Sequence, residues 1–320
     1  MKKMFSKAVV ATLVAGLFAV SSVQAATVYK KDGFTYKIKG DLQIQLRQDP
    51  GVDQDMDVEY DDLEIKNSVS YDLDDNMTAF GQLDFGFKDA ADDDGQDNPE
   101  LEEAYIGFGF DKFSVLVGKT DSAADEFGIQ GAYEHPLDED AFDYTGYTDG
   151  DDLIKAEADF GAVTVVVAHE IEAESEKSDG NGEFTDIFVG TEFSGIELGL
   201  AYQTAEVSDV EFDTYGVSIG YSADMFSVAA DYSEVDSDDD ADDMTEWNLF
   251  ASVKVADTTT LGAGYAVQDF DLSDEEIKGW YANVTYKFPS QKNVKVFAEI
   301  ADTDEDDSDM GYLVGAQIKF

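Results

Sequence analysis

The sequence predicts an all-β fold, a sixteen-stranded antiparallel β-barrel that spans a membrane. Three observations predict it. Apolar and polar residues alternate with a period of two along sixteen segments. The connections between the segments are alternately short and long, and the long ones hold most of the acidic residues. Aromatic residues gather near the segment ends. Together these features are typical of transmembrane β-barrels.

Composition limits the possible classes of protein. The 320 residues include 20 Lys and Arg against 72 Asp and Glu, for a formal charge of −52. A disordered acidic chain would be less apolar, because 43% of these residues are hydrophobic and 12% are aromatic. The negative charge repels phosphates, so we expect no nucleic acid partner. The absence of Cys excludes disulfides, thiolate metal sites and thiol catalysis.

The first residues have the pattern of a secretory signal peptide. Lys2, Lys3 and Lys7 precede an apolar run at 8–20, and small residues follow up to Ala25. The run is too short for a spanning helix, which needs about 20 residues. We therefore expect cleavage after Ala25, with residues 26–320 forming the barrel.

The first barrel strand shows the alternation most clearly. Uncharged residues from Phe34 to Leu46 alternate with a polar set that runs from Thr35 to Arg47, so one face is apolar and the other is wet. The sixteen strands are expected at about 34–47, 58–73, 77–87, 101–110, 113–119, 152–160, 163–170, 184–193, 196–203, 212–221, 226–235, 245–255, 259–268, 277–288, 294–301 and 311–320.

Eight long connections separate pairs of strands joined by short turns. They lie at 48–57, 88–100, 120–151, 171–183, 204–211, 236–244, 269–276 and 302–310. They hold 45 of the 72 acidic residues but only two of the cations, Lys88 and Lys177. The acid therefore belongs mainly to one end of the barrel. Long loops at one end and tight turns at the other are the layout of outer-membrane barrels.

Aromatic residues mark both ends of the expected strands. Phe110, Phe160 and Phe288 lie beside short turns, whereas Trp247 and Trp280 lie near the long loops. Such belts mark the two membrane–water interfaces. A soluble β-sandwich or propeller shares the alternation, but it gives no reason for one-sided loops or an even strand count.

Four patches occur in order along the chain. They read LEIKN at 63–67 with FGQLDF at 80–85, EAYIGF at 103–108 with VGK at 117–119, EFG at 126–128, and YLVGAQIKF at 312–320. In this order they resemble the Gram-negative general porin family of trimeric, sixteen-stranded outer-membrane diffusion channels. The resemblance implies a homotrimer in the outer membrane, in contact with lipid and lipopolysaccharide. It also implies that the assembly machinery of that membrane reads the alternating C-terminal residues Tyr312, Val314, Ala316, Ile318 and Phe320.

The connection at 120–151 is the longest, and a loop of that length is usually functional or disordered. The resemblance identifies it with the third loop of porins, which folds inward and narrows the channel. It has no Lys or Arg. We expect its carboxylates to form an acidic constriction, from Asp121, Asp125, Glu126, Glu134, Asp138, Glu139, Asp140 and Asp143.

Porins place a basic cluster on the wall opposite this loop. Carried over by position, the family's arginines fall on Lys119 and Lys155 and a nearby lysine on Lys66, all expected to face inward. The remaining arginine position holds Asp62, so one cation has become an anion. We place Lys39 on the same pore wall.

These expectations describe a channel for passive diffusion of small hydrophilic solutes and ions. Carboxylates in a narrow pore attract cations, so we expect a cation preference. Small inward residues, such as Gly199, Gly216 and Gly264, favour an open lumen. Two alternatives stay open: a substrate-selective porin, and a blocked barrel whose acidic loops bind cations at the surface or serve a structural role.

The sequence carries no sign of an enzyme. His135 and His169 are the only histidines, and no P-loop, G-x-S-x-G or H-E-x-x-H motif occurs. We expect no cofactor and no tightly bound metal. The aspartate runs at 92–94, 238–240 and 304–309 lack EF-hand spacing, which leaves only weak Ca²⁺ or Mg²⁺ binding at the loops as an open question.

Overall fold

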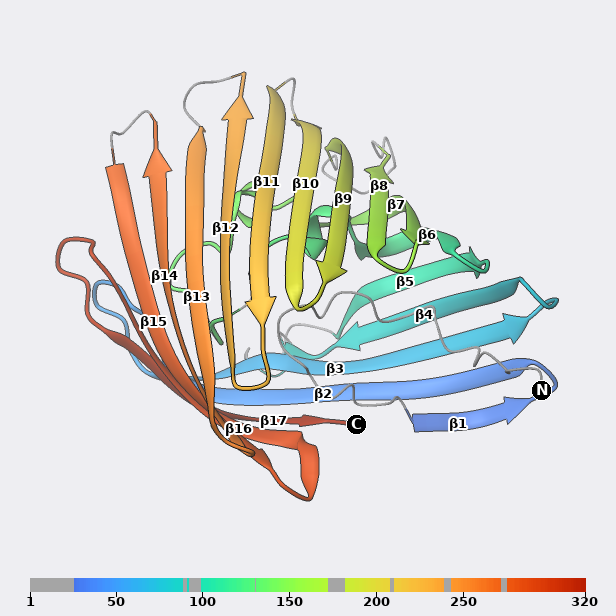
Figure 1. Ribbon diagram of the computed structural model, residues 1–320, viewed down its shortest axis with the longest axis horizontal. Coiled ribbons are helices and arrows are strands. Elements are labelled where there is room, and N and C mark those ends of the chain that lie inside the picture. The colour runs from blue at the N-terminus through green and yellow to red at the C-terminus, as the bar shows by residue number, and fades with distance from the viewer. Residues whose placement is uncertain are drawn as a thin grey trace.

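The computed structural model describes residues 26–88, 91, 99–129, 131–171, 182–207, 210–238, 243–271 and 275–320, so the expected signal peptide lies outside the described residues. One antiparallel sheet of seventeen strands forms a curved wall (Figure 1). The first nine strands are β1 (Ala26–Lys31), β2 (Phe34–Gln48), β3 (Asp57–Asp72), β4 (Thr78–Gly86), β5 (Glu100–Gly109), β6 (Phe113–Asp121), β7 (Asp149–Asp159), β8 (Val163–Glu170) and β9 (Glu183–Phe193). The others are β10 (Ile196–Val207), β11 (Val210–Ser222), β12 (Phe226–Ser237), β13 (Met244–Ala256), β14 (Thr259–Phe270), β15 (Glu275–Phe288), β16 (Gln291–Thr303) and β17 (Gly311–Lys319).

Strands β2 to β17 close into a barrel. Each pairs with the next, and β17 pairs back onto β2, in a register that runs from Tyr312 opposite Gln48 to Lys319 opposite Asp41. Every expected strand matches one of these sixteen, so the predicted antiparallel barrel is confirmed. Closure leaves no long edge strand exposed within the membrane, where unpaired backbone groups are costly.

Strand β1 was not predicted. It lies along the start of β2 (Figure 1) and pairs with it from Ala26 to Lys31. It takes the edge of β2 that β17 leaves free, because β17 ends opposite Asp41. The missed signal is the dipeptide Asp32-Gly33: both residues have positive φ, as a tight two-residue hairpin turn requires.

The wall is polar inside and apolar outside. On β2, Asp41, Gln43 and Gln45 are buried on the inner face, whereas Leu42 and Ile44 are exposed. The distribution of polar and apolar residues is the reverse of that in a soluble protein, because lipid replaces the protein core as the apolar environment. It follows the predicted alternation. No helix in the described part of the chain is long and apolar enough to cross a membrane.

The two ends of the barrel differ as predicted. Connections of two to five residues join β3 to β4 and the later alternate pairs at what we call the turn end. At the opposite loop end, most connections have six residues or more, and the exceptions are the two residues between β10 and β11 and the four between β14 and β15. One predicted loop is wrong: 204–211 is mostly strand, since β10 continues to Val207 and β11 begins at Val210. The alternation there continues through Thr204 and Ala205 to Glu206, so both strands extend further than predicted.

The connection between β6 and β7 lies inside the barrel (Figure 1). We call residues 122–148 the lumen segment. It contains the short helices η1 (Ala124–Glu126) and α2 (Ala141–Thr145). All three buried apolar clusters of the described chain include residues of this segment, packed on the inner faces of β7 to β16. The apolar core of the protein is therefore the contact between the lumen segment and the wall.

Candidate functional site

Aromatic rings fill positions where the wall has glycine. The Phe127 ring of the lumen segment lies over Gly216, where an added Cβ would come within 2.4 Å of the ring. The Tyr281 ring covers Gly264 in the same way. The small inward residues therefore make room for packed rings, which differs from the open lumen that we expected of them.

Polar inner-wall side chains bind the backbone of the lumen segment. Asn283 Nδ2 donates to the Gly131 carbonyl at 2.8 Å, and Gln203 Nε2 donates to the Tyr147 carbonyl at 2.7 Å. Asn248 Nδ2 donates to the Glu139 carbonyl at 2.8 Å. Backbone groups taken out of water need such partners. These inward amides hold the segment across the lumen, and the sequence analysis missed them because inward polarity is common to every strand.

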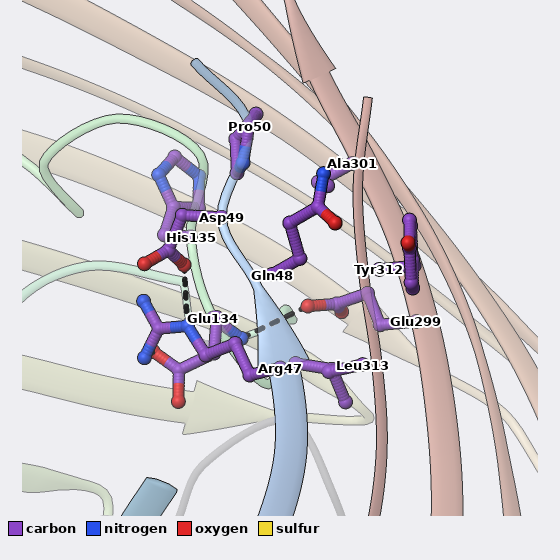
Figure 2. A pocket seen from close by; sticks show the side chains of 11 residues that line it. Arg47, Gln48, Asp49, Pro50, Glu134, His135, Glu299, Ala301, Tyr312 and Leu313 are labelled. Carbon is purple, nitrogen blue, oxygen red and sulfur yellow. Dashed lines mark hydrogen bonds and ion pairs between the residues drawn. The ribbon is translucent and has the colours of Figure 1, made fainter. Parts of the chain in front are cut away.

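Glu134 anchors the segment to β2 and β16 (Figure 2). Its Oε2 lies 2.8 Å from Arg47 Nη1, and its backbone N–H donates to Glu299 Oε1 at 2.9 Å. The Tyr133 N–H donates to the other Glu299 oxygen at 2.9 Å, and the Tyr133 ring stacks on Phe297 with centroids 3.7 Å apart. Glu134 is thus a structural anchor as well as a lumen carboxylate.

Asp140 has a structural role. It is the N-cap of α2, and its buried carboxylate accepts from the Phe142 N–H at 2.8 Å and the Asp143 N–H. Gly146 ends the helix in the left-handed conformation, with φ of 73°. Burial, together with the charges of Asp143 and Asp231, raises the pKa of Asp140 well above its usual range. Its contribution to a lumen field is therefore smaller than the sequence analysis expected.

The remaining predicted acidic residues face the lumen. Asp121 (at the end of β6), Asp125, Asp138, Glu139 and Asp143 are exposed, and Glu126 is half-buried. Desolvation within the barrel and repulsion from Asp121 and Glu126 raise the pKa of Asp125 to about 8. Desolvation is also the main cause that raises the pKa of Glu126 to about 7 and that of Glu139 to about 7. These carboxylates titrate near neutral pH.

No cation offsets this charge within the segment. The lumen segment has neither Lys nor Arg, and burial lowers the pKa of His135, its only histidine. The ring of His135 instead packs edge-on against Tyr281, with centroids 5.6 Å apart. A neutral imidazole adds no positive charge at pH 7.

Three of the predicted wall cations, Lys66, Lys155 and Lys39, differ in burial and in their acidic partners. Lys66 faces inward and lies 2.7 Å from Asp84 and 3.1 Å from Glu64, so acid surrounds it. Lys155 is buried on the inner face, 3.8 Å from Glu157. Lys39 is exposed opposite Lys66.

Lys119 departs from the prediction. It pairs with Ala104, on the face of β5 that exposes Ile106 and Phe108, and it follows the exposed Val115 and Val117 in the alternation of β6. Paired residues share a face, so Lys119 belongs to the outward set. Asp62 is paired with the inward Gln43 and adds acid to the lumen. Two of the positions that the family pattern makes basic, those of Asp62 and Lys119, thus place no cation in the lumen.

Among the residues that the structure describes, two groups of carboxylates have the geometry to hold a hard cation. In each, ligand oxygens lie within 4.8 Å of one another: Glu64, Asp84 and Glu102 in one, and Asp151, Asp152 and Glu170 in the other. The ammonium of Lys66 already lies among the first group. Neither group includes the aspartate runs named above, of which 92–94 and 239–240 lie outside the described residues.

The C-terminal residues share one face of β17. Tyr312, Val314, Ala316 and Ile318 are exposed outward, and Phe320 follows them. The Phe320 ring lies over Gly40, where a Cβ would come within 2.2 Å of it, and its backbone exchanges two hydrogen bonds of 2.9 Å with Gly40. The residue thus seals the seam between β17 and β2.

A closed sixteen-stranded barrel, apolar outside and polar inside, defines a transmembrane β-barrel protein. The chain belongs to the Gram-negative porin family, whose model matches residues 10–308. It is located in the outer membrane and is not an enzyme, because the members of this family are outer-membrane channels without catalytic activity.

Particular relatives match between 82% and 95% of the chain. The porin-like protein H of Photobacterium profundum is 24% identical over 95% of this chain and 97% of its own length. The outer membrane porin protein OmpD of Citrobacter koseri is 26% identical over 82% of this chain and 68% of its own length. Among solved structures, OmpT of Vibrio cholerae in its trimer form has a TM-score of 0.73 at 18% identity, over 90% of this chain and 100% of that one.

Proposed function

We propose that the protein forms a water-filled channel for passive diffusion of small hydrophilic solutes and ions, narrowed by the lumen segment and selective for cations. The observation that carries the proposal is the set of exposed carboxylates on the lumen segment, which has neither Lys nor Arg. Asp125, Glu139 and Asp143 face the lumen, and Lys66 is neutralised by Glu64 and Asp84. Rings of carboxylates in a narrow pore favour cations.

The loop end adds to this preference. The long connections hold most of the acid of the chain, and a mouth lined by one sign of charge concentrates counter-ions. The effect weakens with salt, because the Debye length falls from about 10 Å at 0.1 M to about 3 Å at 1 M. We also propose a homotrimer, supported by the trimer form of Vibrio cholerae OmpT.

The experiment is single-channel recording of purified protein in planar bilayers. We expect stable open channels whose conductance rises when Arg47 is replaced by Gln, since the lumen segment loses an anchor to the wall. Lys278→Gln is the matched control, because it removes a cation at the loop end whose ion pairs are to Glu276 and Asp304, neither of which belongs to the lumen segment. Correctly folded protein that never conducts would refute the channel.

A further inference from the structure

Besides the carboxylates of the lumen segment, the lumen has a group of lysines at its turn end, and the proposed cation selectivity does not explain them. Lys254 (β13), Lys287 (β15) and Lys292 (β16) line a cavity of about 760 Å³, which also contacts Gly128 and Ile129 of the lumen segment. Lys295 faces inward on β16, two residues before the buried Phe297. We call Lys254, Lys287, Lys292 and Lys295 the lysine vestibule.

Two of the lysines in the vestibule are cross-strand neighbours. Lys287 lies directly opposite Lys295 on the neighbouring strand. Like charges in that position are destabilising. The ammonium of Lys287 is also repelled by those of Lys254 and Lys292. The arrangement is therefore unfavourable unless negative charge is supplied.

The described residues supply none at bonding distance. None of the four lysines makes an ion pair within the part of the chain that the structure describes, although acidic residues outnumber basic ones more than threefold. The Nζ of Lys295 instead lies 4.5 Å from the centroid of the Tyr133 ring and 5.2 Å from that of Phe297. Lys319 nearby differs, because it pairs with Asp41 at 2.5 Å.

Hydroxyl and carboxylate side chains line the same cavity as the lysines. Hydroxyls of Ser252, Thr260 and Thr285 line it on the lysine side and can donate hydrogen bonds. Its acidic residues are Glu126 of the lumen segment, Asp224 and Asp257 in turns, and the cross-strand pair Glu192 and Glu197. That pair belongs to β9 and β10, five or six strands away from Lys287 around the barrel. The lumen is thus basic on one wall of its turn end and acidic in the lumen segment above it.

We propose that the lysine vestibule binds small multivalent oxyanions, solutes that carry phosphate or several carboxylate groups. Several ammonium groups around one water-filled cavity match a compact multivalent anion, since charge-assisted hydrogen bonds to phosphate or carboxylate are strong. The acidic loop end repels such anions. The vestibule therefore fills from the turn end, and occupancy obstructs the ion path. This inference rests on the proposed channel and names a solute class that the channel retains.

The test uses pyrophosphate as the probe and the potassium current of single channels in 0.1 M KCl as the readout. Pyrophosphate added to one side of the bilayer is expected to reduce the current at least several-fold more than the same concentration on the other side. The double variant Lys287→Gln/Lys295→Gln is expected to lose this sided block. In 1 M KCl the block is expected to fade, because screening is then strong.

Lys112→Gln is the matched control. It removes one cation from the β5–β6 turn at the same end, from an exposed position outside the residues that line the cavity. It is expected to keep the wild-type block. Sided block that persists unchanged in Lys287→Gln/Lys295→Gln, or no block from either side, would overturn the proposal.

The failure of this inference differs from the failure of the proposed channel. A channel that conducts potassium without any pyrophosphate block keeps the proposed function and removes the anion site. If folded protein does not conduct, calorimetric titration of pyrophosphate into the detergent-solubilised wild type and the double variant still tests the lysines. Equal heats for the two proteins would refute the vestibule as a binding site.

Discussion

Arg47 Nη1 lies 2.8 Å from Glu134 Oε2, and this ion pair joins the first barrel strand to the middle of the lumen segment. Both side chains are largely shielded from water, and Glu134 also receives a hydrogen bond from Gln45. The pair links the polar inner wall to the segment that crosses it. Its two residues are 87 positions apart in the sequence.

Removing this cation is expected to loosen the segment. Arg47→Gln leaves Glu134 partly buried without a positive partner, which should lower the free energy of unfolding by about 1–3 kcal/mol. Urea unfolding in lipid vesicles measures the loss. Lys278→Gln, whose ion pairs are more exposed, should cost less than about 1 kcal/mol. Equal losses in the two variants would contradict the anchoring role of Arg47.

Gly216 is expected to be intolerant of any side chain while Phe127 is present. Its added Cβ would come within 2.4 Å of the ring, so Gly216→Ala should destabilise the barrel by about 1–3 kcal/mol through overpacking. In a double-mutant cycle, Phe127→Ala should remove most of the cost of Gly216→Ala. Additive losses, measured by the same unfolding assay, would show that the ring does not press on this position.

Cation selectivity is expected to rise with pH. The pKa of Asp125 is raised to about 8 and that of Glu139 to about 7, so both carry protons at pH 5 and are increasingly ionised by pH 9. A raised carboxylate pKa adds negative charge to the lumen as pH increases through it. The ratio of potassium to chloride permeability should therefore increase between pH 5 and 9.

The matched variant for this titration is Asp125→Asn/Glu139→Gln, which should flatten the pH dependence of the permeability ratio. Asp74→Asn, in the exposed turn between β3 and β4, removes an acid outside the lumen and should leave the curve unchanged. A wild-type ratio that falls as pH rises would contradict the assignment of these carboxylates to the ion path.

Phe320→Ala is expected to reduce the yield of folded barrel. The Phe320 ring covers Gly40 at the seam between β17 and β2, and the family resemblance gives the same residue a role in assembly. Folding of purified variant into detergent, followed by its electrophoretic mobility with and without heating, tests the seam without any assembly machinery. Normal folding in vitro with failed assembly in cells would assign Phe320 to recognition alone.

The barrel could be predicted from the sequence because period-two alternation and membrane solvation act on every strand. The same face of β2 that reads Asp41, Gln43 and Gln45 is the buried inner face. Strand β1 was missed, since its six residues show no alternation and only the Asp32-Gly33 turn signals it. Asp-Gly is a preferred pair for a two-residue hairpin turn, in which both residues take positive φ, as Asp32 and Gly33 do.

The site was less predictable, because it depends on register and on contacts distant in sequence. Lys119 shares the polarity of the inward set, but it alternates with the exposed Val115 and Val117 on β6, which places it on the outward face. Asp140 reads like the other loop acids, yet its carboxylate caps α2. The lysine pair Lys287 and Lys295 is apparent only once β15 and β16 are aligned.

Cation preference is the central claim, and the reversal potential of the purified protein in a KCl gradient tests it most directly. The gradient should run from 0.1 M to 0.5 M KCl at pH 9, above the raised pKa values of Asp125 and Glu139, where both carboxylates are largely ionised and screening is moderate. We predict a reversal potential with the same sign as the potassium equilibrium potential, and a smaller magnitude in Asp125→Asn/Glu139→Gln. A reversal potential of the sign set by chloride would contradict the account.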